Sequence, residues 1–131
     1  EQTERLRRLR AAMKIAAAAR PRIVKGNLLG DELAALCRQA PRDATLVIFH
    51  TAVLAYIASR TDRQVFAERA MSLCQFWIAN ETPRVFPDIA SRTGTPPRPG
   101  DFLLSVNGSP VAWTDPHGGA IDWIGSLPTD A

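Results

Sequence analysis

ATLVIFHTAVLAY, residues 44–56, is the stretch that decides the fold. Thr45 to Phe49 is an uninterrupted apolar and β-branched run that ends at the polar, titratable His50. Runs of this kind are typical of strands that are covered on both faces in the parallel sheets of α/β proteins. Ligands of such sheets bind beyond the carboxyl ends of the strands, so the sequence predicts a site near His50.

The composition suits one globular domain or part of one. The chain has 131 residues, a formal net charge of +3 and 46% hydrophobic residues. Basic residues are concentrated in the first fifth of the chain: Arg5, Arg7, Arg8, Arg10, Lys14, Arg20, Arg22 and Lys25. We interpret them as the solvated face of a helix and not as a nucleic-acid interface, because no aromatic residues interleave with them for base stacking.

The cysteines and the hydropathy pattern favour a cytoplasmic location. Cys37 and Cys74 lie far apart in helical patterns without metal-ligand spacing, which favours free thiols in a reducing cytoplasm and no metal site. The sequence contains no signal peptide and no apolar run of membrane-spanning length. The chain opens inside a charged, helix-like segment, EQTERLRRLR, without an initiating Met, so we expect a fragment or a processed chain.

Helices and strands alternate over the first two thirds of the chain. An amphipathic helix from Thr3, with an apolar stripe at Leu6, Leu9 and Met13, ends before Pro21. The further predicted elements are a strand at Arg22–Lys25, a helix at Glu32–Gln39 capped by Asp31, the strand Thr45–Phe49, a helical turn at Ala52–Ala55, a helix opening at Asp62 and a strand at Gln75–Ala79.

The last third of the chain changes character. Residues 82–100 contain five prolines and are predicted to form a long loop or lid. Phe102–Val106, the strong hairpin signal Asn107-Gly108 and Val111–Thr114 then predict an antiparallel hairpin. Ala120–Ile124 adds a third strand, which makes an antiparallel meander.

Four segments carry a resemblance to known families: ERLRRLRAAMKIA (4–16), ATLVIFHTAVLAYI (44–57), FWIANE (76–81) and PHG (116–118). The order of elements resembles the carboxyl-terminal half of a Rossmann-like S-adenosylmethionine (SAM) methyltransferase. The local sequence resembles more closely an uncharacterised bacterial family, the domain of unknown function numbered twenty-three thirty-two.

The resemblance implies an α/β fold with a mostly parallel, methyltransferase-type sheet and a carboxyl-terminal antiparallel hairpin or meander. Residues 1–131 would form the carboxyl-terminal half of that single, incomplete domain. The cofactor would be SAM, with most of its site outside this chain and Asn27 near the adenine, where the family usually carries Asp.

Such a half sheet needs a partner. In the methyltransferase strand order, two absent strands separate Arg22–Lys25 from Thr45–Phe49, which leaves an unpaired, apolar strand edge. We expect a missing amino-terminal half, a second chain or homo-oligomerisation to cover it.

The candidate site residues follow the predicted strands or lie in the late turn. His50 is the candidate proton acceptor, the alternative being a histidine that binds a loop backbone. Glu81 and Asn80 follow the next strand at the same sheet edge, where Glu81 orients a substrate or pairs with His50. Tyr56 supplies a phenolic donor or packs in the core. His117 closes over the site or fills the Pro-His-Gly-Gly turn.

These residues support two principal hypotheses. The first is a fragment of a SAM-dependent methyltransferase of unknown substrate, in which the protein mainly positions the reacting groups. The alternative is a non-catalytic binding or assembly module with a degenerate methyltransferase fold. Nucleic-acid binding through the basic first helix is a third, less favoured option.

Overall fold

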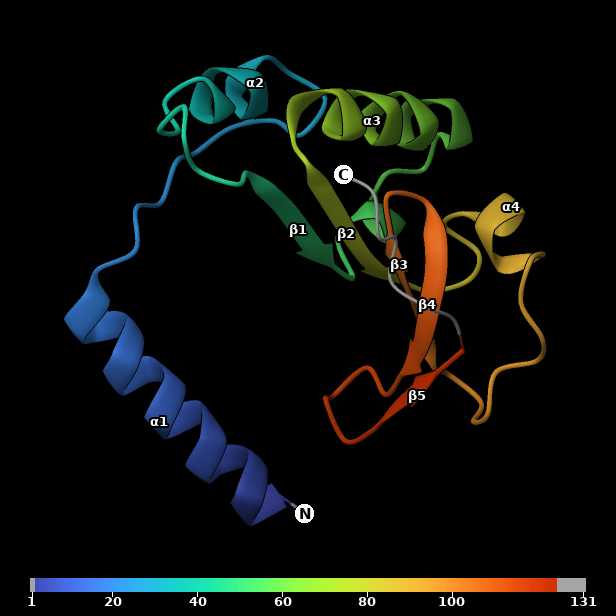
Figure 1. Cartoon of the computed structure of the whole chain (residues 1–131). Helices are drawn as coiled ribbons and strands as arrows, with labels where there is room; N and C mark the ends of the chain where they lie inside the picture. Colours follow the sequence, from blue (N-terminus) through green and yellow to red (C-terminus); the bar gives the residue numbers. More distant parts are fainter. Residues whose placement is uncertain (1, 125–131) are drawn as a thin grey trace.

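A single five-stranded sheet organises the chain (Figure 1). The structure is a computed structural model that describes residues 2–124. Its spatial strand order equals the chain order, β1-β2-β3-β4-β5. The strands are β1 (Val47–Thr51), β2 (Phe76–Glu81), β3 (Phe102–Val106), β4 (Ser109–Thr114) and β5 (Ile121–Trp123).

Only one neighbouring pair of strands is parallel. β1 and β2 run parallel, and the other three pairs are antiparallel. The prediction of a mostly parallel sheet is therefore wrong for the described residues, whereas the predicted carboxyl-terminal meander is confirmed. A crossover that contains η1 and α3 joins β1 to β2 and permits their parallel pairing. Short turns join β3 to β4 and β4 to β5, which therefore pair antiparallel, whereas the longer segment 82–101 joins β2 to β3.

The β3–β4 hairpin has the turn that its sequence predicts. Asn107 and Gly108 have φ angles of 48° and 74°, the left-handed conformation that a type I′ turn requires at both central residues. The Asn107 side chain also accepts a hydrogen bond from the backbone N–H of Trp77 at 2.8 Å. The turn is thereby tied to the start of β2.

Five helical segments accompany the sheet: α1 (Gln2–Ala19), α2 (Glu32–Cys37), the 3-10 turn η1 (Leu54–Tyr56), α3 (Arg60–Leu73) and α4 (Pro87–Ala90). The Ser59 side chain caps α3 by accepting a bond from the Asp62 backbone N–H. Asp31 does not cap α2 as predicted, because its carboxylate binds the Arg69 guanidinium instead. None of the described helices is both long and apolar enough to cross a membrane.

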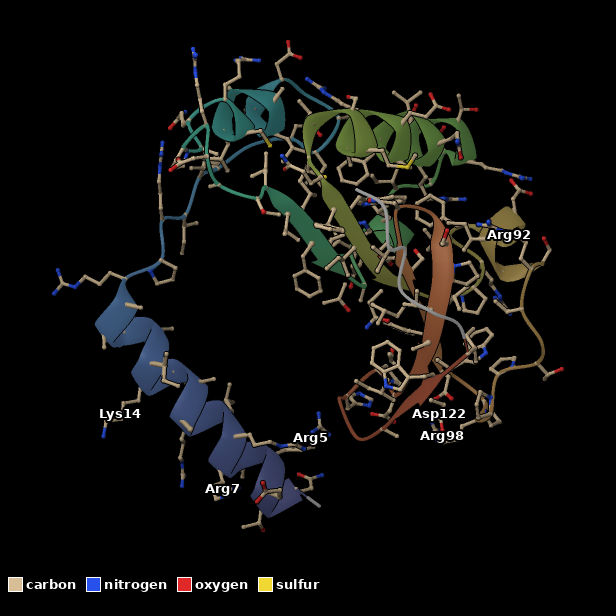
Figure 2. The ribbon with its side chains drawn as sticks, viewed as in Figure 1. Arg5, Arg7, Lys14, Arg92, Arg98 and Asp122 are labelled. Carbon is tan, nitrogen blue, oxygen red and sulfur yellow. The ribbon has the colours of Figure 1, made fainter. Side chains whose placement is uncertain are left out.

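The predicted loop at residues 82–100 contains the short helix α4, which begins at Pro87. The rest of the segment lacks regular structure but is anchored at its end. Arg98 pairs with Asp101, which is buried, and with Asp122 on β5 (Figure 2).

The core lies between one face of the sheet and the helices above it. Ile48, Trp77 and Ala79 point from β1 and β2 toward Phe66 and Ala70 of α3. Leu54, Ala67 and Val85 complete the buried cluster, and Leu33 and Cys37 of α2 pack against it. Figure 1 shows α2 and α3 on this same side of the sheet.

The opposite face of the sheet is exposed along the edge strands β1 and β5, whereas Val106, Ala112 and Thr114 on its inner strands are buried. The large apolar side chains exposed on this face are Val47, Phe49, Ile121 and Trp123, which are 46%, 63%, 57% and 62% exposed. We call these four residues the open face. Burial alternates along β1, so the prediction that this strand is covered on both faces is wrong for the structure described, in which α2 and α3 pack on one face only.

The amino-terminal segment stands apart from the sheet. α1 buries none of its residues, and its basic side chains project into solvent (Figure 2). Arg22–Lys25 forms no strand, which corrects the prediction, and Ile23 is almost fully exposed. A strand needs a hydrogen-bonded neighbour, and none of the described strands lies beside this segment.

The core predicts the first mutational result. Phe66→Ala should destabilise the fold by about 3–5 kcal/mol, because it removes a ring that is almost completely buried against the sheet. Val65→Ala, on the exposed side of α3, should change stability by no more than about 0.5 kcal/mol. Urea unfolding followed by circular dichroism measures both. Equal effects of the two substitutions would contradict the packing described above.

Candidate functional site

The carboxyl ends of the two parallel strands form the candidate site. The register places His50 beside Ala79 and Thr51 beside Asn80. Side chains alternate across a strand, so His50 and Glu81 point to the helix-covered face, whereas Thr51 and Asn80 point to the opposite one. Glu81 and Asn80 share one edge of the sheet, as predicted, but their side chains point to opposite faces.

His50 is held on both sides of its ring. Its Nδ1 lies 2.9 Å from Glu81 Oε1, and the Trp77 indole Nε1–H donates to its Nε2 at 3.0 Å. An indole nitrogen only donates, so Nε2 must be the unprotonated acceptor and Nδ1 must carry the proton given to Glu81. The edge of the Phe66 ring closes the pocket around the imidazole at 5.6 Å between centroids.

Glu81 is the acceptor at the centre of this network. Its side chain is 2% exposed, and Oε1 accepts from His50 and from the backbone N–H groups of Val53 and Leu54 at 2.9 and 3.0 Å. Burial raises the pKa of Glu81, but the bonds donated by His50, Leu54 and Val53 outweigh it and hold the pKa below the ordinary value of 4.5. Oε2 is buried without a hydrogen-bond partner in the protein.

These bonds shape the turn that follows β1. Ala52 has a φ of 53°, a left-handed conformation that costs a non-glycine residue about 1–3 kcal/mol. Its backbone N–H donates to the carbonyl of Asn80 at 3.0 Å. Glu81 then satisfies the next two N–H groups, at the start of η1. The carboxylate therefore stabilises the strained turn after β1.

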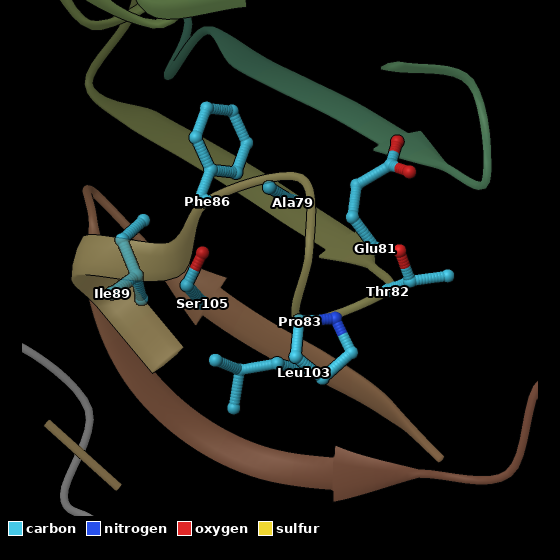
Figure 3. Close-up of a pocket in the computed structure, with 8 residues that line it drawn as sticks. All are labelled: Ala79, Glu81, Thr82, Pro83, Phe86, Ile89, Leu103 and Ser105. Carbon is cyan, nitrogen blue, oxygen red and sulfur yellow. The ribbon is translucent and has the colours of Figure 1, made fainter. Parts of the chain in front are cut away.

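The cavity beside Glu81 is small (Figure 3). Its volume is about 10 Å³, and its lining residues are Ala79, Glu81, Thr82, Pro83, Phe86, Ile89, Leu103 and Ser105. A space of this size holds about one water molecule. The cavity beside Glu81 therefore has no room for a substrate in this conformation.

A second polar group lies on the opposite face of the sheet. Asn80 donates through Nδ2 to Thr51 Oγ1 at 3.3 Å and accepts from Thr114 Oγ1 at 2.7 Å. Thr51 is exposed, whereas Thr114 is buried. We call these three residues the polar cluster. It borders the open face, since Trp123 of β5 belongs to the same row across the sheet as Thr51 and Asn80.

The remaining predicted residues lie outside this network. Tyr56 ends η1 and is 90% exposed, so it neither joins His50 nor packs in the core. His117 is exposed in the β4–β5 turn, where its N–H donates to Asp115. Asn27 accepts from the Leu29 N–H in the loop before α2. None of the three is brought to the carboxyl edge of β1 and β2.

Trp77, Thr51 and Thr114 are site residues that sequence reasoning missed. The period-two spacing of Trp77 and Glu81 places both side chains on one face of β2. That spacing was a usable signal. Thr114 carried none, because its contact with Asn80 depends on the pairing of strands far apart in sequence.

The glycines before α2 pack against the Glu32 side chain. The glycines that precede α2 are occupied by the chain's own side chain: a Cβ at Gly26 would lie 2.8 Å from Cβ of Glu32, and Gly30 would meet the Glu32 carboxylate. These glycines therefore allow close packing of Glu32 and do not form an open cradle. No group of three or more His, Cys, Asp or Glu side chains within residues 2–124 is arranged to hold a metal ion.

The fold and site define a mixed α/β protein with one parallel strand pair, an antiparallel meander and a buried Trp–His–Glu network at the edge of its sheet. Residues 1–123 match the model of a family described as an uncharacterized protein conserved in bacteria, DUF2332. The chain belongs to this family. No curated protein and no solved structure matches it significantly.

The lowered pKa of Glu81 predicts a pH dependence. The unfolded chain takes up a proton at Glu81 near pH 4.5, before the folded chain does, so the stabilisation is complete above that pH and is lost as pH falls through the lower folded pKa. Glu81→Gln should cost about 1–3 kcal/mol at neutral pH because it removes a charged acceptor. The difference from the unmodified protein should shrink in acid.

Urea unfolding at a series of pH values measures this dependence. Glu68→Gln, which removes an exposed carboxylate on α3, is the matched control and should leave stability nearly unchanged. A Glu81→Gln effect that is equally large at pH 3 and pH 7 would show that the charge of Glu81 does not stabilise the fold.

Proposed function

We propose that this chain is a non-catalytic binding and assembly module that docks a partner on the open face of its sheet. The observation that carries the proposal is that β1, although parallel to β2, is covered on one face only and leaves Val47 and Phe49 exposed on the other. Parallel strands are normally covered on both faces, and clustered exposed apolar side chains mark interaction sites.

The arrangement of His50 supports a structural role over a catalytic one. Its Nε2 lone pair is engaged by Trp77 and its Nδ1 proton by Glu81, and the side chain is buried. To accept a proton from a substrate, the ring would have to lose the bond from Trp77 and move toward solvent. We infer that His50 positions the turn at Ala52 through Glu81.

The surroundings of the open face match those of a binding surface. The polar cluster of Thr51, Asn80 and Thr114 borders the apolar side chains of Phe49 and Trp123. Protein interfaces typically combine an apolar centre with a polar rim that supplies hydrogen bonds. The exposed hydroxyl of Thr51 is one such group.

The proposal predicts that the folded protein binds a hydrophobic dye at the open face. Anilinonaphthalene sulfonate should bind the native chain saturably, and Trp123→Lys should weaken that binding several-fold because it places a charge in the apolar surface. Dye titration followed by fluorescence measures the effect.

Val65→Lys is the matched control, since Val65 is similarly exposed but lies on α3, over the covered face. It should leave dye binding unchanged. Circular dichroism and cooperative unfolding establish that each variant is folded. Dye binding that is absent, or equally strong in Trp123→Lys, would refute the open face as a docking surface.

The second candidate is the substrate side of a SAM-dependent methyltransferase. The observation that favours it is the meeting of polar side chains from both parallel strands at their carboxyl ends, where α/β sheets bind ligands. Methyl transfer relies mainly on positioning, so it does not require His50 as a base. Here Thr51 and Asn80 would orient a substrate, and most of the SAM site would lie outside the described residues.

Calorimetric titration of the full-length protein with SAM separates the two candidates, because that protein would include the rest of the SAM site. A non-catalytic module should give no binding heat at millimolar SAM. Saturable binding that Asn80→Ala weakens would favour the methyltransferase instead, because Asn80 is central to the polar cluster.

A further inference from the structure

β1 leaves one hydrogen-bonding edge of the sheet open. Among the described strands, it pairs with β2 on one side only. Natural proteins usually blunt such edges with proline, charged side chains or bulges. The β1 sequence, VIFHT, contains no proline, Lys, Arg, Asp or Glu, and its pairing with β2 is regular. This edge is therefore competent to pair with a further strand.

α1 is a helix without a partner. Leu6, Leu9 and Met13 form one exposed stripe, and no residue of the helix is buried. Helices in proteins gain most of their stability by packing an apolar face, so α1 would be stabilised by a surface that covers this stripe. In Figure 1 it stands beside the sheet on the side of β1, and its N-terminal half approaches the β4–β5 turn, where Arg8 reaches the Gly118 carbonyl at 3.5 Å.

We propose that the open edge of β1 and the open face receive a second copy of this chain; this inference rests on the assembly function proposed above. The two β1 strands pair antiparallel about a two-fold axis through Phe49. In that register Phe49 meets its counterpart and Val47 faces the partner's Thr51. Paired residues of an antiparallel ladder point to the same face, so the open faces of both copies form one continuous surface.

α1 completes the proposed dimer by packing its stripe on the open face of the other copy. A stable interface needs about 800 Å² from each partner, roughly a tenth of the 9285 Å² exposed by this chain. The five residues of β1 are too few to supply this area alone. In a dimer with two-fold symmetry, α1 of each copy would cover the exposed apolar side chains of the other copy.

Charge favours packing of α1 on a sheet over packing on another α1. The helix carries five basic residues and one acidic residue, so two such helices in contact would repel each other. The open face carries no formal charge, and it therefore accepts the apolar stripe while the basic residues stay in solvent.

Sedimentation velocity tests the dimer across a micromolar concentration series. The unmodified chain should sediment as a dimer, and Phe49→Lys or Met13→Lys should weaken dimerisation by about tenfold or more. Val65→Lys and Ile15→Lys are the matched controls. Ile15 is as exposed as Met13 but lies on the other side of α1, so both controls should remain dimeric. A monomeric unmodified chain, or a dimer insensitive to Phe49→Lys and Met13→Lys, would overturn the proposal.

A disulfide tests the register directly. Phe49→Cys should form an intermolecular disulfide under mild oxidation, because directly opposed residues of antiparallel strands have Cα atoms within bridging distance. Val65→Cys and the unmodified chain, which contains the half-buried Cys37 and Cys74, should not. A dimer that Phe49→Cys fails to cross-link would exclude this pairing.

The dye titration distinguishes failure of the dimer from failure of the proposed function. A monomer whose dye binding still depends on Trp123 overturns the self-association and retains the docking surface. A monomer without such binding overturns both.

Discussion

The hydrogen bond between Glu81 and His50 is the interaction on which the rest of the site depends. It joins the carboxyl ends of the two parallel strands inside the core. A carboxylate that is 2% exposed needs donors, and Glu81 obtains them from His50, Val53 and Leu54. Because those donors come from β1 and the turn after it, satisfying one buried charge also determines the path of the chain from the sheet toward α3.

This network explains why the most suggestive residue of the sequence is not available for proton transfer in the structure. A histidine at the end of a strand is well placed for catalysis, but Trp77 and Glu81 use both of its ring nitrogens. His50 therefore acts as a structural residue, because both of its ring nitrogens are hydrogen-bonded within the core. The surface that we propose for binding lies on the other face of the sheet, where Phe49 and Trp123 are exposed beside the polar cluster.

Several elements were predictable because their signals are local. Asn107-Gly108 specifies its own turn, and α3 has the apolar periodicity and the polar start of a helix. The apolar run Thr45–Phe49 contributes its last three residues to a strand that continues through His50 to Thr51. The pairing of Glu81 with His50 was among the alternatives, since consecutive parallel strands bring their ends together. Arg22–Lys25 has the composition of a strand but not the conformation, because strand formation requires a neighbour that composition does not encode.

The sequence by itself determined the alternation of helices and strands, the closing meander and the edge of the sheet at which polar residues gather. These follow from periodicity and turn chemistry, which act over a few residues. Only the tertiary structure decided that the side chains of Glu81 and Asn80 point to opposite faces, that Trp77 donates to His50 and that β1 and β5 expose apolar side chains on one face of the sheet. Those outcomes depend on register and on which helices pack where, and these are contacts between segments distant along the chain.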